Sequence, residues 1–182
     1  MPTVNFEEIY QATQDFKEQL PFLIQTVVAL NAQTVLELGT DVGDSTRIFS
    51  RALTLTGGRL FTVDLKPPKW DARLMRAYYN VHVITAESTS IGWDQPLDLV
   101  FIDDHVAGMD VYTHLLAELN KFGRWVRVGG QILVHDTLHN EFGPPIQKAM
   151  TEWTTKHELP FVNDVRQHGL GIIQITHKLE IA

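Results

Sequence analysis

The sequence predicts an α/β fold: a doubly wound, mostly parallel sheet of seven strands with helices on both faces. Short apolar segments alternate with segments of helical periodicity between residues 34 and 157. These apolar segments are nearly continuous, as is typical of strands buried on both faces. The last two, 160–165 and 170–176, follow each other without a helix. We therefore expect them to form an antiparallel hairpin at one edge of the sheet.

The individual elements follow from their start and stop signals. Asn5 and Glu8 have the spacing of a capping box, and Pro21 is expected to end this first helix and open a second. Strands are expected at 34–39, 59–65, 81–85, 97–103, 129–136, 160–165 and 170–176. Further helices are expected at 45–55, around 74–79, at 108–122 and at 144–157.

Length and composition limit the function classes. A chain of 182 residues suggests one domain, with helices at 1–33 and a cofactor-binding core at 34–182. The net charge of −7 argues against a nucleic-acid or anionic-membrane binder. The chain has no cysteine, which excludes thiolate chemistry. The N-terminus lacks the pattern of a secretory signal, and no apolar run is long enough for a membrane span, so we expect a cytoplasmic protein.

The loop in VLELGTDVGDST, residues 35–46, indicates the ligand. Gly39 and Gly43 allow a tight turn before a helix, although a plain strand-to-helix connection would need glycine as well. A dinucleotide site would have G-x-G-x-x-G, and a Walker-type phosphate loop would have a lysine. Here the spacing is E-x-G-x-x-x-G, and Asp41 and Asp44 would repel a diphosphate. S-adenosylmethionine, which has a sulfonium, an ammonium and no phosphate, fits better.

Other strand ends supply matching groups, because ligands of such sheets bind beyond the carboxyl ends of the strands. Asp64 could accept both hydrogen bonds of a ribose diol, and Glu87 is placed to meet the adenine edge. The plainer alternative for each is a solvated loop acid. Trp70 could line the same pocket, although packing is the simpler reading.

Five motifs in register, ELGTDVG, VDL, AES, LVFIDDH and VGGQILVHDT, resemble the Rossmann-like class I S-adenosylmethionine-dependent methyltransferases. The likeness is greatest to small metal-dependent O-methyltransferases of the catechol, macrocin and cephalosporin types. The resemblance implies cofactor binding by Glu37, Gly39, Thr40, Asp41, Gly43, Ser45, Asp64, Glu87, Ser88 and Asp103. It implies a magnesium or manganese ion held by Asp103, His135 and Asp136, and a hydroxyl of a small molecule or sugar as methyl acceptor.

Two departures from the family pattern affect the site. The segment Ile102-Asp103-Asp104-His105 is one residue shorter than the related pattern, which leaves open whether Asp103 or Asp104 points into the site. His135 replaces the usual carboxylate, and imidazole suits manganese, iron, nickel or zinc better than magnesium.

Other assignments remain open at this stage. Asp136 could instead cap a turn, and the acids near 103 could cap the following helix. His105 or His135 could serve as the general base, with or without a metal. A protein that binds the cofactor without catalysis, as a partner subunit, is the main alternative, and a nicotinamide-dependent oxidoreductase is a weaker one. The short N-terminal region makes a homodimer plausible.

Overall fold

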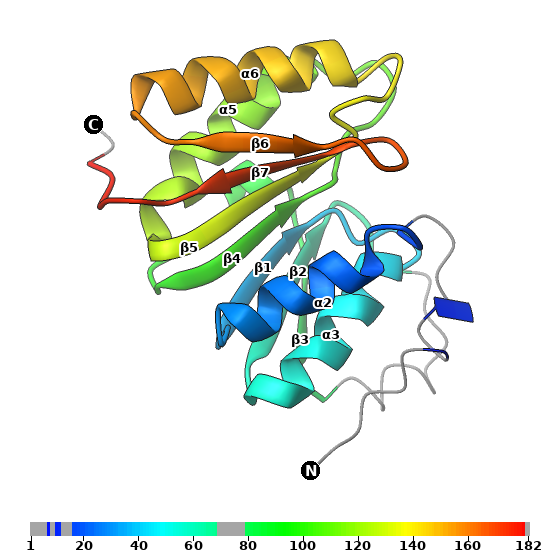
Figure 1. Ribbon diagram of the computed structural model, residues 1–182. Helices are drawn as coiled ribbons and strands as arrows, with labels where there is room; N and C mark the ends of the chain where they lie inside the picture. The colour runs from blue at the N-terminus through cyan, green and yellow to red at the C-terminus, as the bar shows by residue number, and fades with distance from the viewer. Residues whose placement is uncertain (1–6, 8–9, 12–15, 69–78, 181–182) are drawn as a thin grey trace.

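A computed structural model describes residues 7, 10–11, 16–68 and 79–180, and its centre is one seven-stranded sheet (Figure 1). The strand order is β3-β2-β1-β4-β5-β7-β6. The strands are β1 Thr34–Leu38, β2 Arg59–Asp64, β3 Val81–Thr85, β4 Leu97–Ile102, β5 Val126–His135, β6 Phe161–Asp164 and β7 Leu170–Gln174. β1 to β5 are parallel, whereas β7 pairs antiparallel with β5 and with β6. The predicted fold, with its antiparallel hairpin at one edge, is confirmed.

Two pairs of helices cover the sheet. α2 (Leu20–Ala29) and α3 (Asp44–Thr56) pack on one face, and α5 (Val111–Phe122) and α6 (Gly143–Lys156) pack on the other (Figure 1). Pro21 lies in the first turn of α2, as expected, although the helix begins one residue earlier. The predicted first helix lies mostly outside the described residues. The predicted helix around 74–79 lies outside them except for its last residue, and Trp70 also lies outside them. No helix of the described ranges is both long and apolar enough to cross a bilayer.

The central strands β1 and β4 are buried on both sides, which explains their continuous apolar sequences. Side chains of β4 alternate between the two cores: Val100 and Ile102 pack beneath α5 and α6, whereas Leu99 and Phe101 pack beneath α2 and α3. β5 begins three residues earlier than predicted. Its pairing with β4 shifts between Leu97 and Leu99, near Gly129 with its φ of 85°, and this irregularity hides the strand start in the sequence.

The switch point of the sheet lies between β1 and β4. The chain leaves β1 toward β2 on one side, and leaves β4 toward β5 on the other. The carboxyl ends of β1 and β4 are therefore where a ligand crevice opens. The backbone N–H of Asp103, which directly follows β4, donates to the carbonyl of Leu38 at the end of β1 (2.8 Å). This bond holds the two strand ends side by side.

Candidate functional site

A cleft of about 580 Å³ opens at the carboxyl edge of the sheet. Its size is within the range of small-molecule sites, roughly 300–1,000 Å³. It is lined by residues following four strands and by two residues near α5: Gly39, Asp41, Val63, Asp64, Leu65, Lys66, Ala86, Glu87, Ser88, Asp103, Asp104, His105, Val106, Met109 and His114. Six of the ten predicted cofactor residues are thus brought together. Lys66 and Met109 are lining residues that the sequence reasoning missed, because nothing in a single sequence marks them.

The loop after β1 can only take its path with glycine at position 39. Gly39 has a φ of 92°, and a Cβ on it would lie 2.2 Å from the carbonyl oxygen of Asp103. A side chain here would therefore push the loop off the end of β4. Gly43, with a φ of 83°, is the N-cap of α3 and turns the chain into that helix.

Four predicted cofactor residues do not line the cleft. They are Glu37, Thr40, Gly43 and Ser45, and all are buried. The Thr46 hydroxyl at the start of α3 donates to a carboxylate oxygen of Glu37 (2.5 Å). Complete burial raises the pKa of Glu37 to about 7, although nearby hydroxyls work in the opposite direction. Glu37 therefore braces the loop and helix from beneath.

Asp64, at the end of β2, is tied to the same loop. Its carboxylate accepts the backbone N–H groups of Thr40 (2.9 Å) and Asp41 (3.0 Å) on one oxygen, and that of Lys66 (3.0 Å) on the other. Partial burial alone would raise the pKa of Asp64, but these three donors lower it below the usual value. A carboxylate has about four acceptor positions, so a ribose diol would share or displace a loop contact.

Glu87 and Ser88 form the opposite wall, after β3. Glu87 caps the short 3₁₀ turn Ser88–Ser90, since its carboxylate accepts the Thr89 backbone N–H (3.0 Å) and hydroxyl (2.7 Å). Burial raises the pKa of Glu87, but the two bonds from Thr89 and the charges of His114 and Lys121 together lower it below the usual value. The turn thus presents an ionised acid at the cleft, whereas the predicted contact to an adenine edge stays a prediction.

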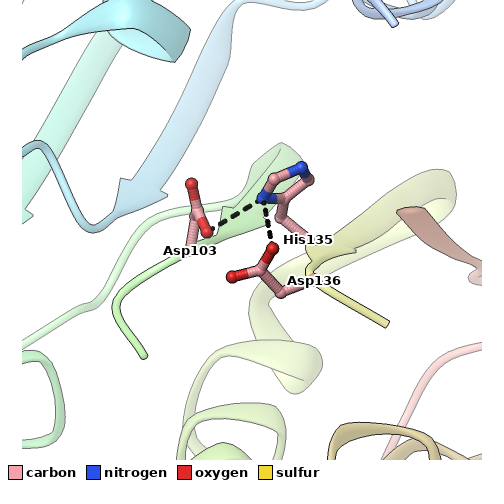
Figure 2. A group of neighbouring side chains, drawn as sticks. All are labelled: Asp103, His135 and Asp136. Carbon is pink, nitrogen blue, oxygen red and sulfur yellow. Dashed lines mark hydrogen bonds and ion pairs between the residues drawn. The ribbon is translucent and has the colours of Figure 1, made fainter. Parts of the chain in front are cut away.

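Asp103, His135 and Asp136 converge beside the cleft, as Figure 2 shows. Nδ1 of His135 lies 3.1 Å from a carboxylate oxygen of Asp103 and 3.4 Å from one of Asp136. Successive strand residues normally point to opposite faces. Asp136 follows the last residue of β5 with a φ of 61°, an uncommon left-handed conformation outside glycine. This turn is what allows two consecutive side chains to meet at one point.

The donor types of this group fit a divalent cation. Burial raises the pKa of Asp136, and the negative charge of Asp103 raises it further. His135 is buried, with its ring 4.6 Å from that of Phe16. One imidazole nitrogen and two carboxylates, all within 4.8 Å of one another, suit manganese, iron or zinc better than magnesium.

The sequence left open whether Asp103 or Asp104 points into the site. Both line the cleft, and they contact different partners. Asp103 faces His135, whereas Asp104 lies 3.1 Å from Nε2 of His114 on α5. Neither caps the following helix, because Asp110 does so by accepting the Thr113 N–H (3.2 Å).

His105 is a less accessible base than expected. Its side chain has no exposed surface, and its Nδ1 lies 3.8 Å from Asp104. Burial lowers the pKa of His105, although the charges of Asp104 and Asp136 oppose this. His105 lines the cleft, and its catalytic role stays a prediction.

A group on α5 was missed by the sequence reasoning, which gave His114 no role. His114 contacts Asp104, Glu118 (3.3 Å) and Ser88 (3.4 Å). Its two carboxylate partners raise the pKa of His114 to about 10, and burial raises that of Glu118 to about 8. The four-residue spacing of His114 and Glu118 was a signal, since it places both on one helix face.

Comparison with known proteins gives a consistent result. A family model described as a methyltransferase domain matches residues 36–137, more than half of the chain. The solved O-methyltransferase from Bacillus cereus, in complex with SAH, has a TM-score of 0.67 at 19% identity and covers 93% of this chain and 90% of its own. The O-methyltransferase TomG from Streptomyces achromogenes, in complex with SAM, has a TM-score of 0.65 at 19% identity, with coverage of 95% and 91%. The N-methyltransferase NodS from Bradyrhizobium japonicum has a TM-score of 0.64 at 13% identity, with coverage of 88% and 96%. At these identities the structural likeness establishes the fold.

Proposed function

Because the chain belongs to the methyltransferase-domain family, we propose that it transfers a methyl group from S-adenosylmethionine to a hydroxyl oxygen of a small molecule or sugar. A divalent metal held by Asp103, His135 and Asp136 assists the reaction. One observation carries the proposal: Asp103 lines the cleft and also contacts His135. A donor bound in the cleft would thus have its reactive end beside this group.

The charge of the cleft supports S-adenosylmethionine as the ligand. Five acids line it, Asp41, Asp64, Glu87, Asp103 and Asp104, against two cations, Lys66 and the imidazolium of His114. A diphosphate would be repelled by this lining, whereas a sulfonium and an ammonium would be attracted. Asp64 is held by the loop after β1 at the end of β2, where an acidic residue accepts ribose hydroxyls in related sheets.

Methyl transfer of this kind is an in-line displacement. The bond from sulfur to the methyl carbon breaks as the bond from the acceptor oxygen to that carbon forms, and the acceptor hydroxyl loses its proton. Alignment of donor and acceptor can contribute roughly 7–11 kcal/mol. A divalent ion, when bound, would lower the pKa of the acceptor hydroxyl and orient it. In a metal-free reaction, the imidazole of His135 beside Asp103 would be one of the groups able to accept the proton.

A methyl-transfer assay with labelled S-adenosylmethionine and a panel of catechols, phenols and sugars tests the proposal. We expect transfer to at least one hydroxyl acceptor. Asp136→Asn removes a ligand of the ion that would assist deprotonation of the acceptor, a contribution of roughly 10²–10⁴-fold, so kcat should fall by about 100-fold or more. Glu180→Gln, which changes an exposed acid, should leave activity unchanged. Tight binding of S-adenosylhomocysteine without transfer to any acceptor would instead indicate a non-catalytic partner protein.

Dialysis against a chelator separates the metal-assisted reaction from a metal-free one. In the metal-assisted case activity is lost and returns with manganese. If activity survives dialysis, the metal part of the proposal is wrong, and His105 or His135 is the base of a metal-free reaction.

A further inference from the structure

A second group of potential metal ligands lies at the α5 side of the cleft, formed by Asp104, His114 and Glu118. Nε2 of His114 lies 3.1 Å from a carboxylate oxygen of Asp104 and 3.3 Å from one of Glu118. Around an ion with bonds of about 2.0–2.2 Å, neighbouring ligands lie roughly 3.0–3.4 Å apart. The two distances from Nε2 of His114 agree with this spacing, and all three donor atoms lie within 4.8 Å of one another.

The fold builds this group from two directions. His114 and Glu118 are four residues apart on α5, so both project from one face of that helix. Asp104 comes from the segment after β4, next to Asp103. His114 and Glu118 are therefore fixed by α5, and Asp104 by the loop that directly follows β4.

Glu118 is the second observation, and it points to a ligand. Its side chain has no exposed surface, and within the described residues neither carboxylate oxygen has a hydrogen-bond partner by geometry. One carboxylate oxygen of Asp104, Oδ1, also has no hydrogen-bond partner among the described residues. Glu118 is fully buried whereas Asp104 is 18% exposed, and ionising a carboxyl as buried as that of Glu118 is costly without a strong counter-charge, which a divalent cation would supply.

We propose that Asp104, His114 and Glu118 bind a divalent cation of the zinc or manganese type. One nitrogen and two oxygen donors suit such ions better than magnesium or calcium. Asp104 and His114 line the cleft, together with Ser88, so an ion has a route from solvent and water can complete its coordination. The ion would clip α5 to the segment that carries Asp103. The site is separate from Asp103, His135 and Asp136, and it does not depend on the proposed methyl transfer.

Calorimetric titration of metal-stripped protein with zinc tests this site. Glu118→Gln removes one ligand at constant shape, and Asp136→Asn does the same at the other group. We expect the wild type to bind two equivalents, each single variant one, and the double variant none. Glu180→Gln should behave as the wild type. Zinc should raise the thermal midpoint of Asp136→Asn but not that of the double variant. Such a rise would show that zinc binds the folded protein.

The outcomes separate this inference from the proposed function. One equivalent in the wild type that is lost in Glu118→Gln supports the second site and counts against a metal at Asp136. The inference is overturned if Glu118→Gln binds zinc with wild-type stoichiometry and affinity, or if the wild type binds none. In that case His114 serves only as an imidazolium between two carboxylates.

Discussion

Replacing Glu37 by glutamine tests whether this residue is a buried brace. The folded protein holds the pKa of Glu37 at about 7, against an ordinary value of 4.5, because the side chain is completely buried. A carboxyl whose pKa is raised by folding stabilises the protein below pH 4.5, and this contribution is lost as the pH rises to about 7. At about 1.36 kcal/mol per pH unit, the loss amounts to roughly 3 kcal/mol.

Glutamine keeps the shape of Glu37 and an oxygen that can accept the Thr46 hydroxyl, but it does not ionise. The free energy of unfolding of Glu37→Gln should therefore lack this pH dependence. Between about pH 5 and about pH 8, the stability of the variant relative to wild type should improve by roughly 2.5 kcal/mol, which is the part of the linkage that falls in this interval.

Urea unfolding of both proteins at these two pH values measures the effect directly. Every other titrating group is present in both proteins, so its contribution cancels when the wild-type free energy of unfolding is subtracted from that of the variant. Glu180→Gln serves as the control and should show no change in the difference. If the wild type and Glu37→Gln lose or gain stability in parallel from about pH 5 to about pH 8, Glu37 is not held in a fully desolvated environment. The description of the loop support would then be wrong.

Three further predictions concern the cleft and the core. Gly39→Ala should lower the free energy of unfolding by about 2–5 kcal/mol, from left-handed backbone strain and the clash with the Asp103 carbonyl; a urea-unfolding loss below about 1 kcal/mol would contradict the predicted clash. Asp64→Asn should weaken S-adenosylhomocysteine binding at least tenfold in calorimetry, about 1.4 kcal/mol, because an amide NH₂ cannot accept the loop N–H groups; unchanged affinity would place the ribose elsewhere. Trp153→Ala should cost about 3–5 kcal/mol in the same unfolding assay, since the ring is 1% exposed, and a small loss would mean that the cavity collapses.

Much of the site could be predicted because the carboxyl ends of parallel strands meet at one edge. Asp64, Glu87 and Asp103 each follow an apolar strand, and strand periodicity alone therefore brings them to the same cleft. Glycine spacing also marked the loop, since only glycine tolerates the close approach at position 39.

What the sequence did not reveal depends on tertiary contacts. The loop after β1 donates backbone N–H groups to Asp64 because the ends of β1 and β2 lie side by side. No local sequence pattern encodes this proximity. Asp136 adopts a left-handed backbone conformation, which an aspartate in the sequence does not by itself indicate. Strand alternation alone would turn one of the pair His135 and Asp136 away, whereas both lie beside Asp103.

A crystal structure with S-adenosylhomocysteine and manganese tests the central claim most directly. The ribose should lie at Asp64, the thioether sulfur should face Asp103, and anomalous density for manganese should lie among Asp103, His135 and Asp136. Adenosylhomocysteine bound outside the cleft, or with its sulfur directed away from Asp103, would contradict the proposal that this strand edge presents a methyl donor to a metal-bound acceptor.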